Sequence, residues 1–324
     1  MNVLITGVNG FVGSHLAETL LESRDIRLFG TMRGAHDSGV IPSLKKTVTR
    51  MQADISDADQ ICRVVDEVRP AKIFHIAGQA FVPTSFENPS ETFQSNVRGT
   101  LNVLEAVRRQ TATKFPCSVL IVSSGEVYGS VPRDQLPIDE QVPLRPENPY
   151  AITKACADVI AQQYHDSFGV DVVVVRPFNH LGQRQSDLFV GSAFAKQIAE
   201  IKYGKRGPKM SVGNLKPQRD FTDVRDVVRA YIKLLERPRE FTVFNVCSGK
   251  AVAIGDVLRL MCDLANVDVE ITPDPKHMRR KDNPLIIGSA ARLQNATGWS
   301  PSIPLKKTLE DLLKYWEARV QHES

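Results

Sequence analysis

The sequence predicts an α/β protein in which a doubly wound parallel sheet is followed by a smaller, mixed α/β lobe. In the first half of the chain, short β-branched runs alternate with helical patterns, which is typical of parallel sheets with right-handed crossovers. Most of these runs lack alternation of polar and apolar residues, as expected of strands that are buried on both faces. No internal repeat or low-complexity tract interrupts this alternation.

The expected elements follow one another in a regular order. Strands are expected at residues 2–6, 26–31, 48–54, 72–77, 118–123 and 171–175. Helices are expected between them at residues 11–22, 57–68, 90–108 and 150–168. In a parallel sheet the strands end at one common edge, and doubly wound folds bind their ligands there.

Beyond residue 176 the pattern becomes irregular, because Pro and Gly are frequent and the candidate strands at 210–212 and 241–246 are short. Helices are still expected at residues 189–202, 223–236, 254–264 and 305–317. We therefore expect a nucleotide-binding Rossmann domain over residues 1–178, rejoined by parts of 220–250. Residues 179–324 are expected to form mainly a substrate-binding lobe at the carboxyl edge of the sheet.

The composition excludes several classes of protein. Hydrophobic residues make up 42% and charged residues 24% of the 324 residues, so the chain has enough apolar material for a large core. The longest aliphatic run, 172–175, is too short to span a membrane. A net charge of +4 suits an anionic small molecule and is too weak to indicate nucleic acid. Five scattered cysteines without a C-x-x-C pair favour the reducing cytoplasm over a disulfide framework or a zinc site.

A glycine-rich turn lies between the first expected strand and the first expected helix. Its glycines, Gly7, Gly10 and Gly13, are spaced G-x-x-G-x-x-G, whereas the commonest dinucleotide-binding turn reads G-x-G-x-x-G. The first glycine permits the tight turn, the second lets the backbone approach a pyrophosphate, and the third allows close packing of helix against strand. Free amides at the start of the helix, around Phe11 and Val12, would then bind the anion.

The end of the second expected strand indicates which dinucleotide is bound. An acidic residue there would bind the adenosine ribose of NAD, but this strand ends in Thr31-Met32-Arg33. The planar guanidinium of Arg33 can pair with a 2′-phosphate, so the sequence favours NADP as the cofactor. The alternative is that Arg33 is a surface arginine that contacts only water. Asp54 ends the next strand. Its carboxylate could contact the edge of the adenine, or it could stabilise the turn that follows the strand, and both alternatives stay open.

Tyr150 and Lys154 stand four residues apart in the helix expected at 150–168, so both lie on one face about one turn apart. An ammonium close to a phenol favours the phenolate and lowers its pKa, which would suit Tyr150 to exchange a proton near neutrality. Neighbouring motifs support this interpretation. Ser123 and Ser124 end the fifth expected strand, where a nicotinamide is expected, and Asn96 lies on the preceding helix.

Together, the glycine turn, the strand-end serines and the Tyr150–Lys154 pair resemble the extended short-chain dehydrogenase/reductase superfamily over nearly the whole chain. Within it, the sequence is most similar to the GDP-6-deoxy-4-keto-D-lyxo-hexose reductases, which form GDP-D-rhamnose. The stretches that carry this likeness are HIAGQ at 75–79, RPFNHLG at 176–182, RDFTDV at 219–224, NVCSG at 245–249 and TGW at 297–299. The resemblance implies NADPH-dependent reduction of the C4 ketone of GDP-4-keto-6-deoxy-D-mannose, and a homodimer formed through two helices.

The resemblance also implies roles for individual residues. Tyr150 would protonate O4 of the sugar, Lys154 would hold the nicotinamide ribose and tune Tyr150, and Ser124 would bond to the same carbonyl oxygen. The cofactor-binding residues expected from the motifs and the resemblance are Gly7, Gly10, Phe11, Val12, Gly13, Arg33, Asp54, Ile55, Ala77, Gly78, Asn96, Ser123, Tyr150, Lys154 and Pro177. The expected substrate-binding residues are Gln79, Ser124, Glu126, Asn179, Arg219 and Arg279, and no metal is expected.

Two departures from the family pattern concern the substrate lobe. The loop at 180–185 reads HLGQRQ where relatives have His-hydrophobic-Gly-Pro-Gly-Gln, so the resemblance does not predict its shape. Asp282 stands where many relatives have glutamate, which shortens the reach of that carboxylate.

Glu126 leaves the reaction open. Sugar-nucleotide 4,6-dehydratases of the superfamily carry Thr-x-Glu where this chain has Ser124-Gly125-Glu126, and they need that carboxyl because water leaves across C5 and C6. A reductase has no such proton to move, and the downstream stretches favour the reductase. The alternatives are a GDP-mannose 4,6-dehydratase that uses Ser124, Glu126 and Tyr150, a protein with both activities, and a non-catalytic nucleotide-sensing scaffold.

Overall fold

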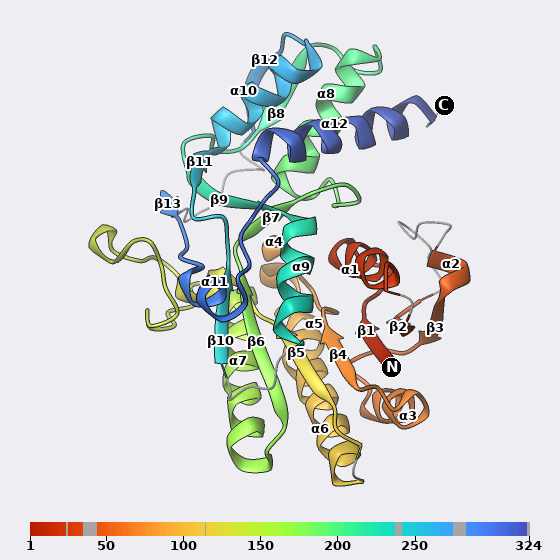
Figure 1. Cartoon of the computed structure of the whole chain (residues 1–324). Coiled ribbons are helices and arrows are strands. Elements are labelled where there is room, and N and C mark those ends of the chain that lie inside the picture. The colour runs from red at the N-terminus through yellow and green to blue at the C-terminus, as the bar shows by residue number, and fades with distance from the viewer. Residues whose placement is uncertain (24, 35–43, 114, 237–241, 275–282, 323–324) are drawn as a thin grey trace.

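The computed structural model describes residues 1–23, 25–34, 44–113, 115–236, 242–274 and 283–322. Its largest element is a seven-stranded sheet with the order β10-β6-β5-β4-β1-β2-β3, in which all neighbouring strands are parallel (Figure 1). The strands are β1 (Asn2–Thr6), β2 (Arg27–Met32), β3 (Val48–Gln52), β4 (Lys72–His75), β5 (Ser118–Val122), β6 (Asp171–Pro177) and β10 (Thr242–Val246). The strand order reverses direction beside β1, as it does in a doubly wound sheet, so the predicted fold class is confirmed.

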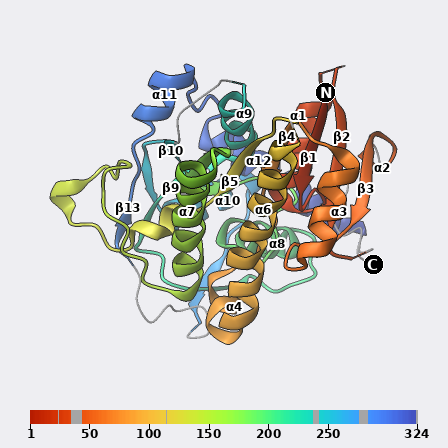
Figure 2. The same cartoon turned by 90° about the horizontal axis from the view of Figure 1, so that it is seen from below.

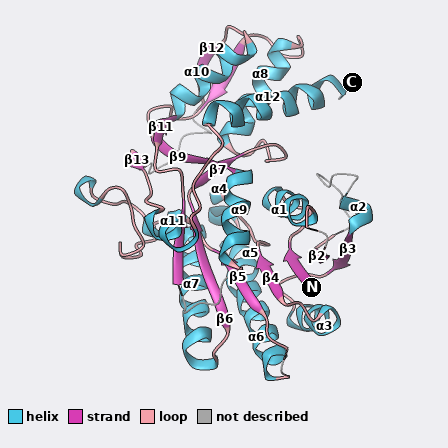
Figure 3. Ribbon diagram, viewed as in Figure 1, coloured by secondary structure: helices cyan, strands magenta, loops and turns pink. Residues whose placement is uncertain are grey.

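Helices cover both faces of the sheet (Figure 3). Along β1, Val3 and Ile5 point into one core and Leu4 into the other, because successive side chains of a strand face opposite ways. The first core is covered by α1 (Phe11–Leu21) and α9 (Val224–Leu234). The second core is covered by α3 (Ala58–Val68), α6 (Gly99–Ala112) and α7 (Pro149–Phe168). Burial of every strand on both faces explains why the strand sequences are almost continuously apolar.

The helix predicted at 90–108 is confirmed, but it contains a π-helical segment that was not predicted. This stretch begins with α5 (Pro89–Phe93), continues as the π-helical segment η1 (Gln94–Arg98) and ends in α6. A π segment disturbs the regular helical hydrogen bonds and is frequent at functional sites. Here it contains Asn96, whose side-chain amide bonds to groups outside its own helix. The sequence did not predict the short helices α2 (Leu44–Thr47) and α4 (Val82–Glu87).

The smaller lobe is built mainly from the second half of the chain, at the carboxyl edge of the large sheet (Figure 1). Its apolar core is formed by α8 (Val190–Lys202), α10 (Ile254–Ala265) and α12 (Leu305–His322). The strands β7 (Asn179–Leu181), β8 (Lys209–Val212), β9 (Gln218–Asp223), β11 (Ala251–Ala253), β12 (Glu270–Pro273) and β13 (Leu285–Ile286) lie outside the large sheet. Helix α11 (Ala291–Thr297) and the 3-10 turn η2 (Gly125–Tyr128) pack against the large sheet, and a second 3-10 turn is η3 (Arg133–Gln135). None of the helices in the described part of the chain is long and apolar enough to cross a membrane.

The loop at 180–185, whose sequence departs from the family pattern, is fastened to α1. The guanidinium of Arg184 forms an ion pair of 2.5 Å with Glu18, and the ring of His15 hydrogen-bonds the carbonyl oxygen of Gln183 at 3.0 Å. Arg184 adopts a positive φ of 70°, which lets the chain turn sharply there. The loop therefore ties the smaller lobe to the helix that follows the glycine turn.

A chain of buried polar side chains runs beside β6 toward the edge strand β10. Arg176 forms an ion pair of 2.6 Å with Asp158 and donates a hydrogen bond of 2.9 Å to the hydroxyl of Tyr128. The Tyr128 hydroxyl in turn donates to Asn245 at 2.7 Å. Asp158 also accepts a hydrogen bond from Ser123 at the end of β5. This chain connects helix α7 to the strands that carry the expected site residues.

Candidate active site

The glycine turn is packed too tightly for side chains. Gly7 has a φ of +73°, and a Cβ there would lie 3.0 Å from the Cα of Ala77. A Cβ on Gly13 would lie only 2.2 Å from the carbonyl oxygen of Gly7. Helix α1 starts after Gly10 without a side-chain cap, so backbone amides at its N-terminus remain available to an anion. These features fit the pyrophosphate of a dinucleotide.

Thr6 connects the glycine turn to the end of β4. Its hydroxyl bonds to the ring of His75 at 2.9 Å and accepts hydrogen bonds from the amides of Ile76 and Ala77 at 3.1 and 3.2 Å. The other ring nitrogen of His75 lies 3.2 Å from the hydroxyl of Thr100, and burial lowers the pKa of His75 to about 3. A neutral, interior histidine thus helps to hold Ala77 against Gly7.

The structure places Arg33 at the open end of β2. Its side chain is 72% exposed and forms an ion pair of 3.4 Å with Glu91 of α5. Asp54 accepts two hydrogen bonds from Ser56, from the amide and from the hydroxyl, so its carboxylate forms the turn after β3. The side chain of Ile55 lies in the apolar core, and its carbonyl oxygen accepts a hydrogen bond from Asn102. The Arg33 side chain therefore extends into solvent at the end of β2, whereas the Asp54 carboxylate already serves the turn.

Tyr150 and Lys154 lie in the first turns of α7 and are both buried. The phenol hydrogen-bonds Ser124, which directly follows β5. Burial raises the pKa of Tyr150 to about 12, so the prediction that Lys154 lowers this pKa is wrong in this structure. The physical reason is that burial outweighs the favourable hydrogen bond from Ser124, while the ammonium of Lys154 donates to the carbonyl oxygen of Val122 at 2.8 Å. Burial also lowers the pKa of Lys154 to about 8.

Asn96 connects Gln79, which follows β4, to helix α7. Its Oδ1 accepts from the amide of Gln79 at 2.8 Å, and its Nδ2 donates to the carbonyl oxygen of Gln79 and to Thr153, each at 3.0 Å. A Cβ on Gly78 would lie 2.7 Å from Asn96 Oδ1 and 3.7 Å from Lys154 Nζ. The structure thus places Gly78, Asn96 and Lys154 in one cluster, as the resemblance implies.

The expected substrate residues are spread over several elements. Asn179 is exposed at the start of β7, two residues after Pro177, which was expected at the cofactor and is buried at the end of β6. Arg219, in β9, is 6% exposed and donates to the carbonyl oxygens of Gln218 and Asn283 at 2.9 and 2.6 Å. Glu126 follows Ser124 in η2, and its amide donates to the Ser124 hydroxyl at 3.2 Å. The expected positions Arg279 and Asp282 lie outside the described residues.

Sequence reasoning missed Ser85. Its hydroxyl, in the short helix α4, accepts a hydrogen bond of 3.2 Å from the backbone amide of Tyr150. Ser85 itself is fully buried and donates to the carbonyl oxygen of Val82 at 2.6 Å. Because 65 positions separate Ser85 from Tyr150, no local pattern in the sequence indicates the contact.

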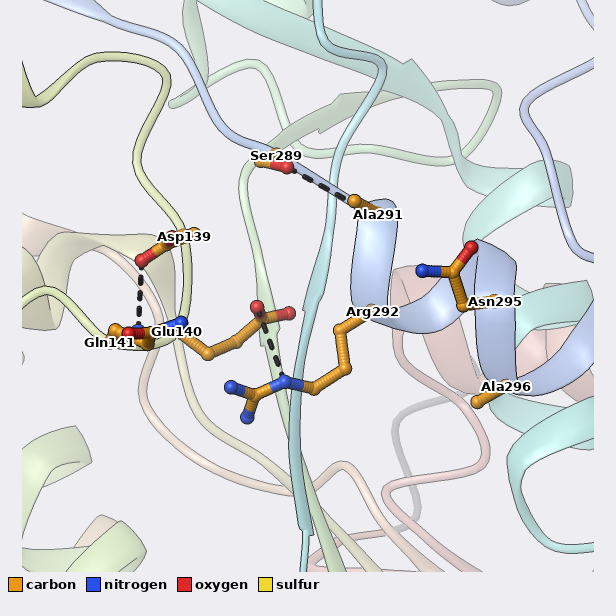
Figure 4. A pocket seen from close by; sticks show the side chains of 8 residues that line it. All are labelled: Asp139, Glu140, Gln141, Ser289, Ala291, Arg292, Asn295 and Ala296. Carbon is orange, nitrogen blue, oxygen red and sulfur yellow. Dashed lines mark hydrogen bonds and ion pairs between the residues drawn. The ribbon is translucent and has the colours of Figure 1, made fainter.

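A hollow of about 560 Å³ lies away from these residues, beside β10 and α11 (Figure 4). Glu140 and Arg292, which both line this hollow, form an ion pair of 3.6 Å. Asp139 and Asn295 also line it, and Figure 4 shows all four side chains. The described residues that line it include none of the expected site residues. Within the described ranges, no group of three or more His, Cys, Asp or Glu side chains is placed to hold a metal ion.

Comparisons with known proteins show which family the chain belongs to. A family model described as GDP-mannose 4,6 dehydratase matches residues 4–312. The chain is 38% identical over 321 residues to the GDP-6-deoxy-D-mannose reductase of Pseudomonas aeruginosa, covering 99% of each chain. It is 26% identical to the GDP-mannose 4,6-dehydratase of Yersinia enterocolitica, covering 96% of this chain and 92% of the relative.

The fold also matches that of a solved structure, RMD from Pseudomonas aeruginosa complexed with NADPH, with a TM-score of 0.83. The identity is 38%, and the match covers 98% of this chain and 99% of the other. The resemblance seen in the motifs is thereby confirmed. The chain belongs to the GDP-mannose 4,6 dehydratase family of extended short-chain dehydrogenases/reductases.

Proposed function

We propose that this protein reduces the C4 ketone of GDP-4-keto-6-deoxy-D-mannose to GDP-D-rhamnose, with NADPH as the cofactor. The observation that carries the proposal is the similarity, over 99% of both chains, to a protein named as a GDP-6-deoxy-D-mannose reductase. The NADPH in the matching RMD structure and the exposed Arg33 at the end of β2 support the choice of cofactor. The tight glycine turn and the uncapped start of α1 suit its pyrophosphate.

In this reaction the residues around Tyr150 handle the proton at the sugar O4. When bound, the nicotinamide supplies the hydride to C4. Tyr150 donates its proton to O4 as the ketone is reduced, and Ser124 donates a hydrogen bond to the same oxygen. Lys154 binds the nicotinamide ribose. Asn96 keeps Gly78 and the Lys154 helix together, so that these groups hold one geometry.

The nucleotide part of the substrate is proposed to bind in the smaller lobe. Asn179 and Arg219 would contact the diphosphate, together with Arg279 outside the described residues. Binding energy from the GDP portion, which does not react, would align C4 with the reacting groups. We also place the protein in the cytoplasm, in keeping with its five cysteines, which all lie among the described residues without a disulfide.

The second candidate function is a GDP-mannose 4,6-dehydratase, which the nearby carboxyl of Glu126 and the family model favour. The absorbance of reduced nicotinamide separates the candidates when each sugar nucleotide is supplied in turn. Loss of NADPH in equal amount to a 4-keto-6-deoxy sugar supports the reductase. A keto product from GDP-mannose without net change of cofactor would overturn it in favour of the dehydratase. No reaction with any sugar nucleotide would point instead to a nucleotide-sensing scaffold.

Arg33→Ala is expected to raise KM for NADPH about tenfold or more and to leave KM for NADH nearly unchanged. The reason is that a charge-assisted bidentate contact with the 2′-phosphate contributes roughly 1.5–3 kcal/mol, and NADH has no such phosphate. Steady-state kinetics with both cofactors measure the two constants. Arg259→Ala, at an exposed arginine of α10 with a similar ion pair, is the control. An equal rise in both constants for Arg33→Ala would refute its contact with the 2′-phosphate.

We propose that the protein forms a homodimer through α6 and α7, which lie side by side (Figure 2). Four large apolar side chains on α5, α6 and α7 are 39–61% exposed: Phe93, Leu101, Ile152 and Val159. The double variant Ile152→Glu/Val159→Glu is expected to be a monomer in size-exclusion chromatography with light scattering, because two buried carboxylates per chain would oppose association. Ile271→Glu, at an equally exposed apolar residue of β12, is expected to keep the dimer. A dimer that survives the double substitution would place the interface elsewhere.

A further inference from the structure

Both polar groups of the Tyr150 backbone are held by side chains. The amide of Tyr150 donates a hydrogen bond of 3.2 Å to the hydroxyl of Ser85, and its carbonyl oxygen accepts one of 2.7 Å from the hydroxyl of Thr153. The Thr153 hydroxyl in turn accepts a hydrogen bond of 3.0 Å from the side-chain amide of Asn96. Ser85, Asn96 and Thr153 are at most 3% exposed, so water hardly competes for these bonds.

These hydrogen bonds close a ring through the segment 79–85. Asn96 binds the amide and the carbonyl oxygen of Gln79, at the start of this segment. Ser85 lies at its end, in the short helix α4. The segment is therefore fastened to the start of α7 at both ends, and the two connections meet at the backbone of Tyr150.

The first turn of α7 explains why the amide of Tyr150 needs a partner from another element. The first amides of a helix have no acceptor in the helix backbone. Pro149 has no N–H, and the amide of Ala151 donates to the side chain of the N-cap residue Asn148 at 2.8 Å. The amide of Tyr150 lies between them, in a residue that is only 8% exposed. Ser85 supplies the acceptor for this amide from outside the helix.

Packing alone does not account for a serine at position 85. Of the six residues of α4, all of which the structure describes, only Ser85 is buried. An apolar side chain usually occupies the buried face of a surface helix, because a buried hydroxyl is unfavourable unless it is hydrogen-bonded. The hydroxyl of Ser85 donates to the carbonyl oxygen of Val82 at 2.6 Å and accepts from Tyr150. Such a short helix is not stable by itself, so its place depends on contacts of this kind.

We propose that Ser85 is a positioning residue, which fixes the backbone of Tyr150 against the segment 79–85 and thereby holds the phenol in place for proton transfer. This inference rests on the proposed function in taking Tyr150 as the proton donor. Without the oxygen of Ser85, the buried amide of Tyr150 is unpaired, and it regains a partner only if the start of α7 moves. The phenol moves with the backbone, and a misplacement of about 1 Å can lower a rate about 100-fold.

Steady-state kinetics of ketone reduction provide the first test. Ser85→Ala is expected to lower kcat about tenfold to 100-fold and to leave KM for NADPH within about twofold, because the glycine turn and Arg33 are unchanged. Ser85→Thr keeps the hydroxyl oxygen and is expected to restore most of the rate. If Ser85→Ala does not fold, Ser85→Cys takes its place, because its sulfur fills the site and is only a weak acceptor.

Thr297→Val is the matched control. The hydroxyl of Thr297, at the end of α11, accepts a hydrogen bond of 3.1 Å from the amide of Trp299 and donates one of 2.8 Å to the carbonyl oxygen of Leu293. It thus makes the same two kinds of bond as the hydroxyl of Ser85, in a helix that carries none of the expected site residues. Thr297→Val is expected to lower the melting temperature as Ser85→Ala does and to keep the wild-type kcat.

A crystal structure of Ser85→Ala, without cofactor or sugar, tests the inference independently of activity. In the wild-type protein the phenol of Tyr150 hydrogen-bonds Ser124. In the variant the phenol is expected to lie beyond hydrogen-bond distance from the Ser124 hydroxyl. If the wild-type protein reduced no ketone, the proposed function would fail, and this structure would still decide whether Ser85 positions the phenol.

Four results would overturn the proposal. A phenol that keeps its wild-type place in the variant structure would show that Ser85 does not position it. A wild-type kcat in Ser85→Ala, with a lower melting temperature, would reduce Ser85 to a helix cap. An equal loss of kcat in Thr297→Val would assign the effect to lost stability. A well-folded Ser85→Thr as slow as Ser85→Ala would show that the hydroxyl oxygen is not what matters.

Discussion

Replacement of Tyr150 by phenylalanine is expected to lower kcat for ketone reduction by about 100-fold to 10,000-fold, the usual contribution of a positioned proton donor. The substitution removes one oxygen atom and leaves the aromatic ring in its buried place at the start of α7. Ser124 keeps its hydrogen bond with the amide of Glu126, so the stability should change by only about 1 kcal/mol. Stopped-flow absorbance of NADPH measures the rate, and the melting temperature checks the fold.

The matched control for this substitution is Tyr231→Phe. The hydroxyl of Tyr231 is buried and has no hydrogen-bond partner among the described residues, so its removal deletes the same atom from another core tyrosine. The rate of Tyr231→Phe is expected to equal that of the wild-type protein. If Tyr150→Phe also turned over at the wild-type rate, Tyr150 would not be the proton donor and the mechanism proposed here would fail.

The second large effect concerns the buried ion pair of Asp158 and Arg176. Asp158→Asn is expected to lower the free energy of unfolding by about 3–5 kcal/mol, because it leaves a buried guanidinium without its counter-charge. The side chains of Asp158 and Arg176 are only 4% and 7% exposed, and the N–O distance between them is 2.6 Å. Burial raises the pKa of Asp158, and the guanidinium of Arg176 opposes this rise. The damage in the variant comes from Arg176, which cannot lose its proton.

Urea unfolding followed by circular dichroism measures this loss. The control is Asp187→Asn, which removes the carboxylate of an ion pair of 2.7 Å with Lys196 whose side chains are 40% and 33% exposed. Such a partly exposed pair contributes about 0–1 kcal/mol, because water screens both charges. If both variants lost equal stability, burial would not be what makes the Asp158–Arg176 pair important.

The strands of the large sheet were predicted from the sequence because each is a continuous apolar run, which burial on both faces demands. The strand expected at 171–175 occurs as β6 and extends to Pro177, and the one expected at 72–77 ends earlier, at His75. The helix expected at 90–108 is present, but the π-helical segment inside it was not predicted. Its apolar spacing is helical throughout, but the π segment at Gln94–Arg98 accompanies side-chain contacts of Asn96 with residues from other parts of the chain.

In the candidate site, features that depend on one short stretch of sequence could be predicted. Contacts between distant stretches could not. The spacing of Gly7, Gly10 and Gly13 was enough to predict a tight turn in front of a helix. The contacts of Ser85 with Tyr150 and of Asn148 with Glu126 span 65 and 22 positions, and no periodicity links such distant residues. Arg219 was predicted as a contact of the diphosphate, and only the structure shows that its guanidinium donates to two backbone carbonyls.

The sequence by itself determined the doubly wound sheet, the glycine turn and the placement of Tyr150 and Lys154 on one helical face, because backbone geometry and hydrophobic periodicity act over a few residues. Only the tertiary structure decided the protonation chemistry of that face. The pKa of Tyr150 rises to about 12 because folding removes the phenol from water. Desolvation depends on everything that packs around a group, and α4, β5, η2 and α7 come together around Tyr150 only when the chain folds.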